Sequence, residues 1–143
     1  MRLRHHVVDV DIVRYARAPL SDAQVVRAVR AAQRAGGRRG SVDVSFVGTQ
    51  RMRKTNRITH GEDTATDVLA FPDGGDAVSL GELVICPQIA KRSAQRAGEP
   101  WPREIIRLLV HGTLHLCGYD HAEPTDAARM FQLQERLVRS VAP

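Results

Sequence analysis

The order of apolar and polar residues predicts a strand, a helix and a second strand in the first third of the chain. Residues 7–13 and 41–47 are rich in β-branched residues with polar residues between them, which is typical of strands. Between them, apolar residues recur at helical spacing from the N-cap Ser21 to about Ala35, where two glycines follow. This order favours a parallel pair of strands joined by a helical crossover.

The middle of the chain predicts a short helix and two more strands. A basic helix begins at Thr49 and is expected to end near Asn56 or Arg57. Residues 67–71 and 80–86 are apolar runs, each followed by a proline, and they predict the third and fourth strands. The glycine-containing connection between these two strands favours an antiparallel pair, so the sheet is expected to be mixed.

The last third of the chain predicts three helices. The first spans residues 88–97 and ends at Gly98, and the second begins near Pro102 and is apolar enough to be almost buried. The third carries an apolar stripe to about Ser140. We therefore expect an α+β fold over residues 1–143, a single domain with a mixed four-stranded sheet and about five helices.

The length and the apolar runs limit the class of protein. A chain of 143 residues fits one domain with one substantial core. No apolar run approaches the length of a membrane span, and the amino terminus lacks the core of a signal peptide, so we expect a cytoplasmic protein without a membrane partner. In that compartment Cys86 and Cys117 are expected to be reduced thiols rather than a disulfide.

Basic residues are concentrated in the first part of the chain. Residues 1–60 hold 13 basic and 4 acidic side chains, a net charge of +9, whereas residues 61–143 hold 8 basic and 12 acidic, a net charge of −4. Two clusters stand out: Arg27, Arg30, Arg34, Arg38 and Arg39, and Arg51, Arg53, Lys54 and Arg57. These clusters form either a contact for RNA phosphates or a solvated face. Aromatic residues are few, which argues against base stacking.

Three histidines near the end of the almost buried helix form a candidate metal site. His111 and His115 are one helical turn apart on one face, about 6 Å along the axis. Gly118 then ends the helix and allows the chain to turn back, so that His121 can supply a third nitrogen. Three histidines with an open fourth position favour one zinc ion, although nickel, copper and iron also accept nitrogen ligands.

The residue after the first histidine indicates which chemistry the site lacks. The same histidine spacing occurs in zinc peptidases, where a glutamate at this position is the general base. Here the position is Gly112. The sequence therefore argues against peptide hydrolysis and for other metal-assisted chemistry.

The run from Leu109 to His121, Leu-Val-His-Gly-Thr-Leu-His-Leu-Cys-Gly-Tyr-Asp-His, resembles the signature of the YbeY family of bacterial rRNA maturation factors. Residues 66–71, Thr-Asp-Val-Leu-Ala-Phe, and residues 80–85, Leu-Gly-Glu-Leu-Val-Ile, resemble two further segments of that family in the same order. The resemblance implies a zinc-dependent endoribonuclease, specific for single strands, that acts in 16S rRNA 3′-end maturation and ribosome quality control. It also implies single-stranded rRNA and the small ribosomal subunit as partners, without a small-molecule cofactor.

There are three candidate catalytic residues, of which the first two, His60 and Arg57, follow from this resemblance. The family has an arginine, considered important for activity, where this chain has His60. Either protonated His60 partly replaces that arginine, or Arg57 reaches the same phosphate. Asp120 precedes the third histidine and either accepts a hydrogen bond from a ligating imidazole or caps the turn into the last helix.

The sequence leaves the nucleophile and two other functions open. Either a metal-bound water or the 2′-hydroxyl of RNA could attack the phosphate. One alternative is a ribosome-associated RNA-binding maturation factor whose zinc is structural and whose nuclease activity is weak or absent. Another is a zinc hydrolase of small molecules, which would need a carboxylate base such as Glu82 or Glu104.

Overall fold

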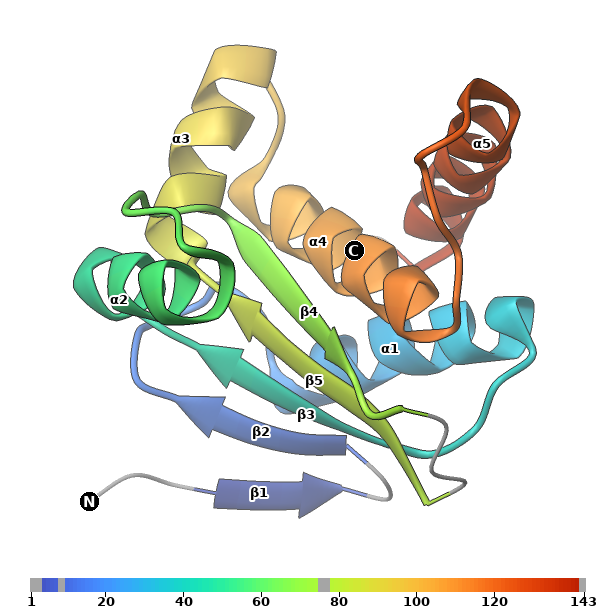
Figure 1. Cartoon of the computed structure of the whole chain (residues 1–143), viewed down its shortest axis with the longest axis horizontal. Coiled ribbons are helices and arrows are strands. Elements are labelled where there is room, and N and C mark those ends of the chain that lie inside the picture. The colour runs from blue at the N-terminus through green and yellow to red at the C-terminus, as the bar shows by residue number, and fades with distance from the viewer. Residues whose placement is uncertain (1–3, 8–9, 75–77, 142–143) are drawn as a thin grey trace.

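The computed structural model, which describes residues 4–7, 10–74 and 78–141, has a mixed sheet with helices on both faces (Figure 1). The strand order is β1-β2-β3-β5-β4, with β2, β3 and β5 parallel and the two outer strands antiparallel to their neighbours. The predicted parallel crossover and the predicted antiparallel pair are both confirmed. The strands are β1 (Arg4–Val7), β2 (Val10–Arg14), β3 (Ser41–Phe46), β4 (Val68–Pro72) and β5 (Ser79–Ile85).

The sheet has one strand more than the four we expected. The single strand predicted over residues 7–13 corresponds to parts of β1 and β2, which pair antiparallel, and residues 8 and 9 lie outside the described residues. No glycine or proline stands between the two strands, and the apolar-polar alternation continues through them. A pattern of period two therefore does not reveal where one strand ends and the next begins.

Five helices lie in the described part of the chain, as the sequence predicted. The first starts with a complete capping box, in which Ser21 Oγ accepts from Gln24 N–H at 3.2 Å and Gln24 Oε1 accepts from Ser21 N–H at 2.9 Å. None of the five has the length and apolarity that crossing a membrane requires. They are α1 (Asp22–Gly36), α2 (Thr49–His60), α3 (Pro87–Ala97), α4 (Trp101–Leu116) and α5 (Pro124–Val141).

The core lies between the sheet and α4. Alternate residues of the central strands, such as Val44 and Leu83, point to this side and are fully buried. They pack against buried residues of α4, including Ile105 and Leu109, and α1 and α5 close the core around them (Figure 1). The predicted burial of this helix is confirmed. The two cysteines are buried and free.

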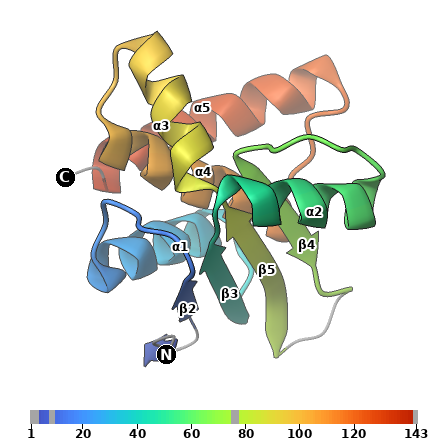
Figure 2. The ribbon, with the colours of Figure 1, turned by 90° about the vertical axis from the view of Figure 1, so that its left-hand side faces the viewer.

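A smaller apolar cluster under α2 covers part of the other face of the sheet. It joins Met52 of α2 to Leu69 of β4 and Val84 of β5, and Figure 2 shows α2 in front of the sheet and α4 behind it. This helix is longer than predicted, because it ends at His60, where Gly61 takes a positive φ and its N–H bonds to Arg57 O. His60 is therefore the last residue of a helix rather than part of a loop.

Candidate metal centre

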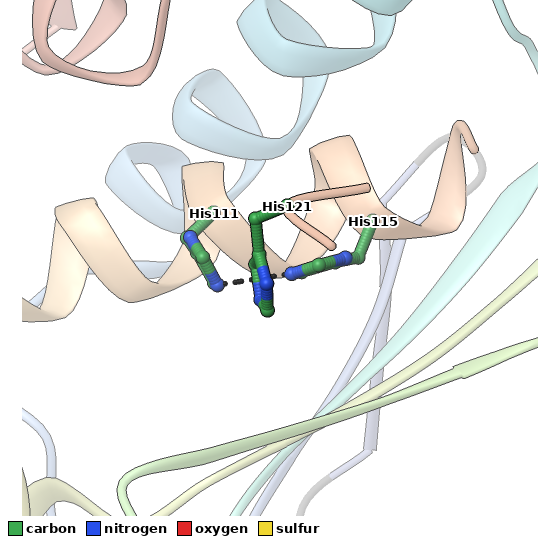
Figure 3. A group of neighbouring side chains, drawn as sticks. All are labelled: His111, His115 and His121. Atoms are coloured by element: carbon green, nitrogen blue, oxygen red, sulfur yellow. Dashed lines mark hydrogen bonds between the residues drawn. The ribbon is translucent and has the colours of Figure 1, made fainter. Parts of the chain in front are cut away.

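The end of α4 and the turn that follows it bring three imidazoles together (Figure 3). His111 and His115 project from one face of α4, and Gly118, with a φ of 99°, reverses the chain after the helix. The predicted end of the helix at this glycine is confirmed. One ring nitrogen of each of His111, His115 and His121 lies within 4.8 Å of the others.

The spacing of two of these nitrogens fits a shared ion. The Nε2 atoms of His111 and His115 are 3.1 Å apart. Two nitrogens bound to one zinc ion at about 2.0–2.1 Å in tetrahedral geometry stand about 3.3 Å apart. The two imidazoles therefore already have the separation of ligands to a single ion.

A glutamine of α5 determines which nitrogen of His111 can bind an ion. His111 Nδ1 lies 2.7 Å from Gln134 Oε1, and an amide oxygen only accepts hydrogen bonds, so Nδ1 carries the proton and Nε2 has the free lone pair. The amide of Gln134 is itself oriented, because its Nε2 donates to Glu135 Oε2 at 3.0 Å. Gln134 is 7% exposed, so the contact is shielded from water.

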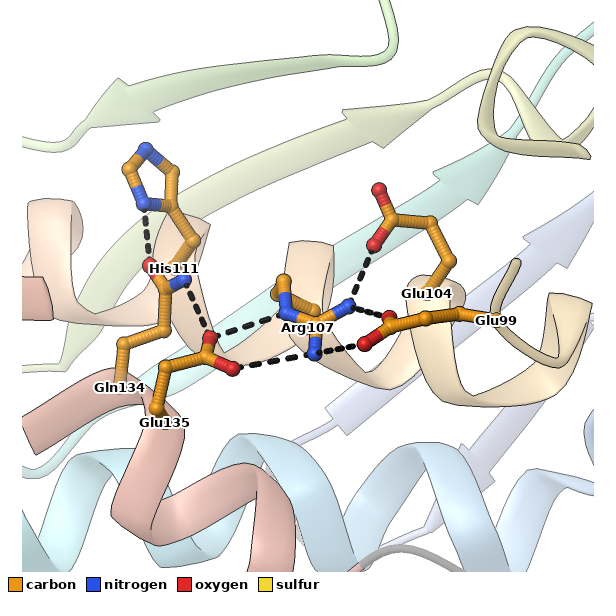
Figure 4. A network of polar contacts seen from close by, with 6 residues as sticks. All are labelled: Glu99, Glu104, Arg107, His111, Gln134 and Glu135. Atoms are coloured by element: carbon orange, nitrogen blue, oxygen red, sulfur yellow. Dashed lines mark hydrogen bonds and ion pairs between the residues drawn. The ribbon is translucent and has the colours of Figure 1, made fainter. Parts of the chain in front are cut away.

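Behind Gln134, one arginine ties three segments of the chain together (Figure 4). Arg107 of α4 donates to Glu135 of α5 at 2.9 Å and to Glu104 at 2.7 Å, and it also pairs with Glu99 from the α3–α4 connection. The hydrogen bond from Arg107 holds the pKa of Glu135 below its usual value, whereas burial raises the pKa of Glu104. The position of Glu135, and through it that of Gln134, is therefore fixed by a network with a side chain only 17% exposed at its centre.

The electrostatics of the centre favour the neutral form of His115. Burial lowers the pKa of His115, and the neighbouring charges of His111 and His121 lower it further. Neutral imidazole is the form that binds a metal ion.

The three histidines open onto a cleft of about 330 Å³ between α4 and β4. His60 lines the same cleft from the end of α2, and its ring stacks on Phe71 with centroids 5.9 Å apart. The structure thus brings His60 to the three histidines although 51 residues of sequence or more separate them.

The other two candidate catalytic residues, Arg57 and Asp120, form contacts of a different kind. Arg57 Nη1 is 3.7 Å from Asp63, and its side chain is not part of the cleft lining. Asp120 Oδ1 accepts a hydrogen bond from the N–H of Ala122 at 3.0 Å, as a residue that caps a turn does. The charge of Asp120 still acts to raise the pKa of His115, so the two are close.

No carboxylate is in a position to replace the missing peptidase glutamate in the described part of the cleft. A Cβ at Gly112 would lie 2.7 Å from Leu83 Cδ2, so the side chain of Leu83 would have to move to admit one there. Glu82 lines a different cavity beneath α2, and Glu104 is bound to Arg107. The described residues of the cleft therefore do not provide the carboxylate base that a small-molecule hydrolase would need.

The role of Gln134 was missed by the sequence analysis, although a signal for it exists. Met130, Gln134 and Val138 follow one another at intervals of four residues, and all three are buried. A glutamine inside an apolar stripe needs a polar partner, since a buried amide without one is costly.

Comparison with known proteins assigns the chain a family and a related structure. The family described as endoribonuclease YbeY matches residues 16–142. A protein named Endoribonuclease YbeY from Salinispora tropica is 40% identical over 114 residues, which cover 69% of this chain and 73% of that protein. A protein of the same name from Frankia casuarinae is 41% identical over 93 residues, and the match spans 46% of its length. The solution structure of TM1509 from Thermotoga maritima has a TM-score of 0.64 and 26% identity, and covers 92% of this chain and 88% of that one.

Proposed function

The chain belongs to the YbeY family of endoribonucleases, and on that premise we propose that it is a zinc-dependent endoribonuclease that cleaves single-stranded RNA. The observation that carries the proposal is the convergence of three histidines on an open cleft, with the tautomer of one ligand set by Gln134. We assign the metal to His111, His115 and His121.

The chain's own residues have separate tasks in this proposal. The three imidazoles hold the ion, and Gln134 keeps the proton of His111 on Nδ1 so that Nε2 faces the ion. A zinc ion bound there would polarise a phosphoryl oxygen or lower the pKa of a bound water toward about 7. The backbone and apolar side chains of residues 68–70 form the wall opposite the histidines and restrict the access of other groups to the reacting phosphate.

We assign the phosphate contact to His60. Thr59 Oγ1 donates its proton to Thr55 O at 2.7 Å, so its oxygen accepts from His60 Nδ1–H at 2.8 Å. This leaves Nε2 of His60 free to donate to a phosphate oxygen when the ring is protonated. Arg57 is the second candidate for this contact, but its pairing with Asp63 holds it outside the cleft lining. Asp120 has a supporting role at the turn before His121.

The biological substrate that we propose is ribosomal RNA. The family supports an endoribonuclease role in rRNA processing. More specifically, we propose 16S rRNA 3′-end maturation and ribosome quality control in the cytoplasm, with the small ribosomal subunit as partner and residues 1–143 acting as one domain.

Metal removal and the end groups of the products test the reaction. Dialysis against a chelator should abolish cleavage of a labelled single-stranded RNA, and zinc should restore it, while a fully paired duplex stays uncut. A 2′,3′-cyclic phosphate on the product identifies the 2′-hydroxyl as nucleophile, and a 5′-phosphate with a free 3′-hydroxyl identifies water. Full activity after the metal has been removed would refute a catalytic ion.

One observation favours a second function, that of an RNA-binding maturation factor with a structural zinc. By the resemblance noted above, His60 takes the place of a family arginine, and a histidine lacks the second donor with which an arginine clamps a phosphate. If this function is correct, the metal-loaded protein binds single-stranded RNA but does not cleave it, and removing the zinc leaves the affinity for RNA unchanged.

A further inference from the structure

An arginine-lined cavity of about 520 Å³ lies where α1 ends and the chain turns toward β3. Arg30 and Arg34 reach it from the last two turns of the helix, and Arg38 and Arg39 reach it from the turn. We call these four side chains the arginine cluster. Its remaining lining is Gln33 and two glycines, so no described acidic side chain lines the cavity.

The turn that carries the cluster is held in place. Gln33 Nε2 donates to Gly40 O at 2.8 Å, and the N–H of Arg38 bonds to Gln33 O at 3.2 Å. At the end of the turn, a Cβ at Gly40 would lie 2.9 Å from Leu80 N, so the turn packs directly on the backbone of β5. Because its backbone is already fixed, the turn itself loses little conformational entropy when a ligand binds.

Three members of the cluster carry charges that no described carboxylate neutralises. Arg34, Arg38 and Arg39 are exposed, and none of them forms an ion pair with a described carboxylate, in contrast to Arg53 and Arg107. The helix dipole favours one cation in the last turn, which accounts for Arg34, but Arg38 and Arg39 lie beyond it. Like charges gathered in this way repel one another unless an anion binds between them.

The cluster and the metal cleft flank the same turn. The ends of α1 and α4 lie side by side (Figure 1), and a Cβ at Gly36 would be 2.7 Å from Cys117 Sγ and 3.9 Å from Tyr119 Cε2. Cys117 and Tyr119 belong to the turn that leads to His121. The turn from Cys117 to His121 is therefore in contact with the end of α1 that carries the cluster.

We propose that the arginine cluster binds phosphates of the same single-stranded RNA whose cleavage we assign to the metal cleft. Guanidinium groups pair with phosphate oxygens through two donors each, and release of counterions makes such contacts strong and salt-dependent. Among the described residues that line the cavity there is no aromatic side chain, so in this proposal the RNA is held by its backbone and not by its base sequence. This inference rests on the proposed function, because it takes RNA as the ligand.

The test measures RNA affinity with cleavage switched off. In a His115→Ala background, the triple variant Arg34→Gln, Arg38→Gln, Arg39→Gln is compared with the triple variant Arg92→Gln, Arg96→Gln, Arg139→Gln, which removes the same charge from exposed positions of α3 and α5. Fluorescence anisotropy with an unstructured RNA should give a Kd raised at least about tenfold for the first variant. The slope of log Kd against log salt should fall by about 2, since each lost contact with a single strand contributes about 0.7.

Three results would overturn the proposal. One is a parent-like Kd for the cluster variant, and another is an equal loss in both triple variants, which would assign the effect to net charge alone. The third is a variant that keeps its RNA affinity but loses binding to poly-glutamate, which would make the cluster a site for an acidic protein. Circular dichroism melts check that both variants fold.

A second measurement needs no variant. Bound RNA should protect Arg34, Arg38 and Arg39 from phenylglyoxal in the unmutated chain, and should leave Arg92 and Arg96 reactive, as mass spectrometry detects. Equal reactivity with and without RNA would contradict the proposal. Because both measurements report binding, a protein that binds RNA through the cluster but never cuts it would refute the endoribonuclease and leave this inference intact.

Discussion

Gln134 holds the proposed ligand His111 through an oxygen that can only accept, and this is the most specific contact at the centre. It lies on a different helix from the histidines, so the position of α5 bears on the ability of α4 to bind a metal. His60, to which we assign the phosphate contact, lines the cleft. Replacing Gln134 or His60 therefore tests the role of a single side chain.

Replacing Gln134 should weaken zinc binding without removing a ligand. In Gln134→Leu, His111 loses the acceptor that fixes its tautomer, and we expect the zinc Kd to rise about 10–100-fold in competition with a chelator. Gln132→Leu, two residues away on the exposed face of α5, is the matched control and should bind zinc as the parent does. Equal zinc affinity of Gln134→Leu and the parent would show that the contact does not position the ligand.

Placing an arginine at position 60 should speed cleavage. A guanidinium stays charged throughout the physiological pH range and offers two donors to a phosphate, so His60→Arg should cleave RNA faster than the parent, most clearly at alkaline pH. Zinc content should not change, since His60 is not one of the assigned ligands. If the rate and its pH profile match those of the parent, position 60 does not contact the scissile phosphate.

At the scale of elements, α4 joins the core, the ion network and the metal centre. Its start, its burial and its end near Gly118 could be predicted, because proline, apolar spacing and glycine are local signals. The contact between Gln134 and His111 and the place of His60 in the cleft could not be predicted from the sequence. They depend on how α5 and α2 pack around α4 and β4. Gly112 illustrates the difference: the sequence indicates the missing glutamate, and only the structure shows that a side chain there would press on Leu83.

Arg107 should stabilise the arrangement of α3, α4 and α5 in a pH-dependent way. Arg107→Met leaves three carboxylates close together, and we expect the free energy of unfolding at pH 7 to fall by about 2–4 kcal/mol in urea denaturation. Arg92→Met, an exposed arginine of α3, is the control and should change it little.

The pH dependence of this effect follows from Glu135. Its pKa is lowered in the fold by Arg107, so the stabilisation is present above the ordinary carboxyl pKa of 4.5 and is lost as pH falls through the folded value. The difference between Arg107→Met and the parent should therefore shrink from pH 7 to pH 3. An equal difference at both values would mean that the arginine acts through packing and not through its charge.

At the scale of the whole molecule, the arginine cluster and the candidate metal centre lie on adjoining parts of the same fold. The basic first part of the chain supplies α1 and the arginine cluster, and the second part supplies the histidines, so the turn between α4 and α5 is where the two meet. The sequence predicted the asymmetry of charge but not this contact, since α1 and the end of α4 are far apart along the chain. The proposed RNA cleavage depends on an ion at the three histidines.

The most direct measurement is the zinc content and the RNA cleavage rate of the same preparations of the parent, His115→Ala and Gln132→Leu. The account predicts one zinc per chain and cleavage for the parent and for Gln132→Leu. For His115→Ala it predicts no bound zinc and a cleavage rate at least about a thousandfold lower. Cleavage at the parent's rate by a His115→Ala protein that holds no zinc would contradict it.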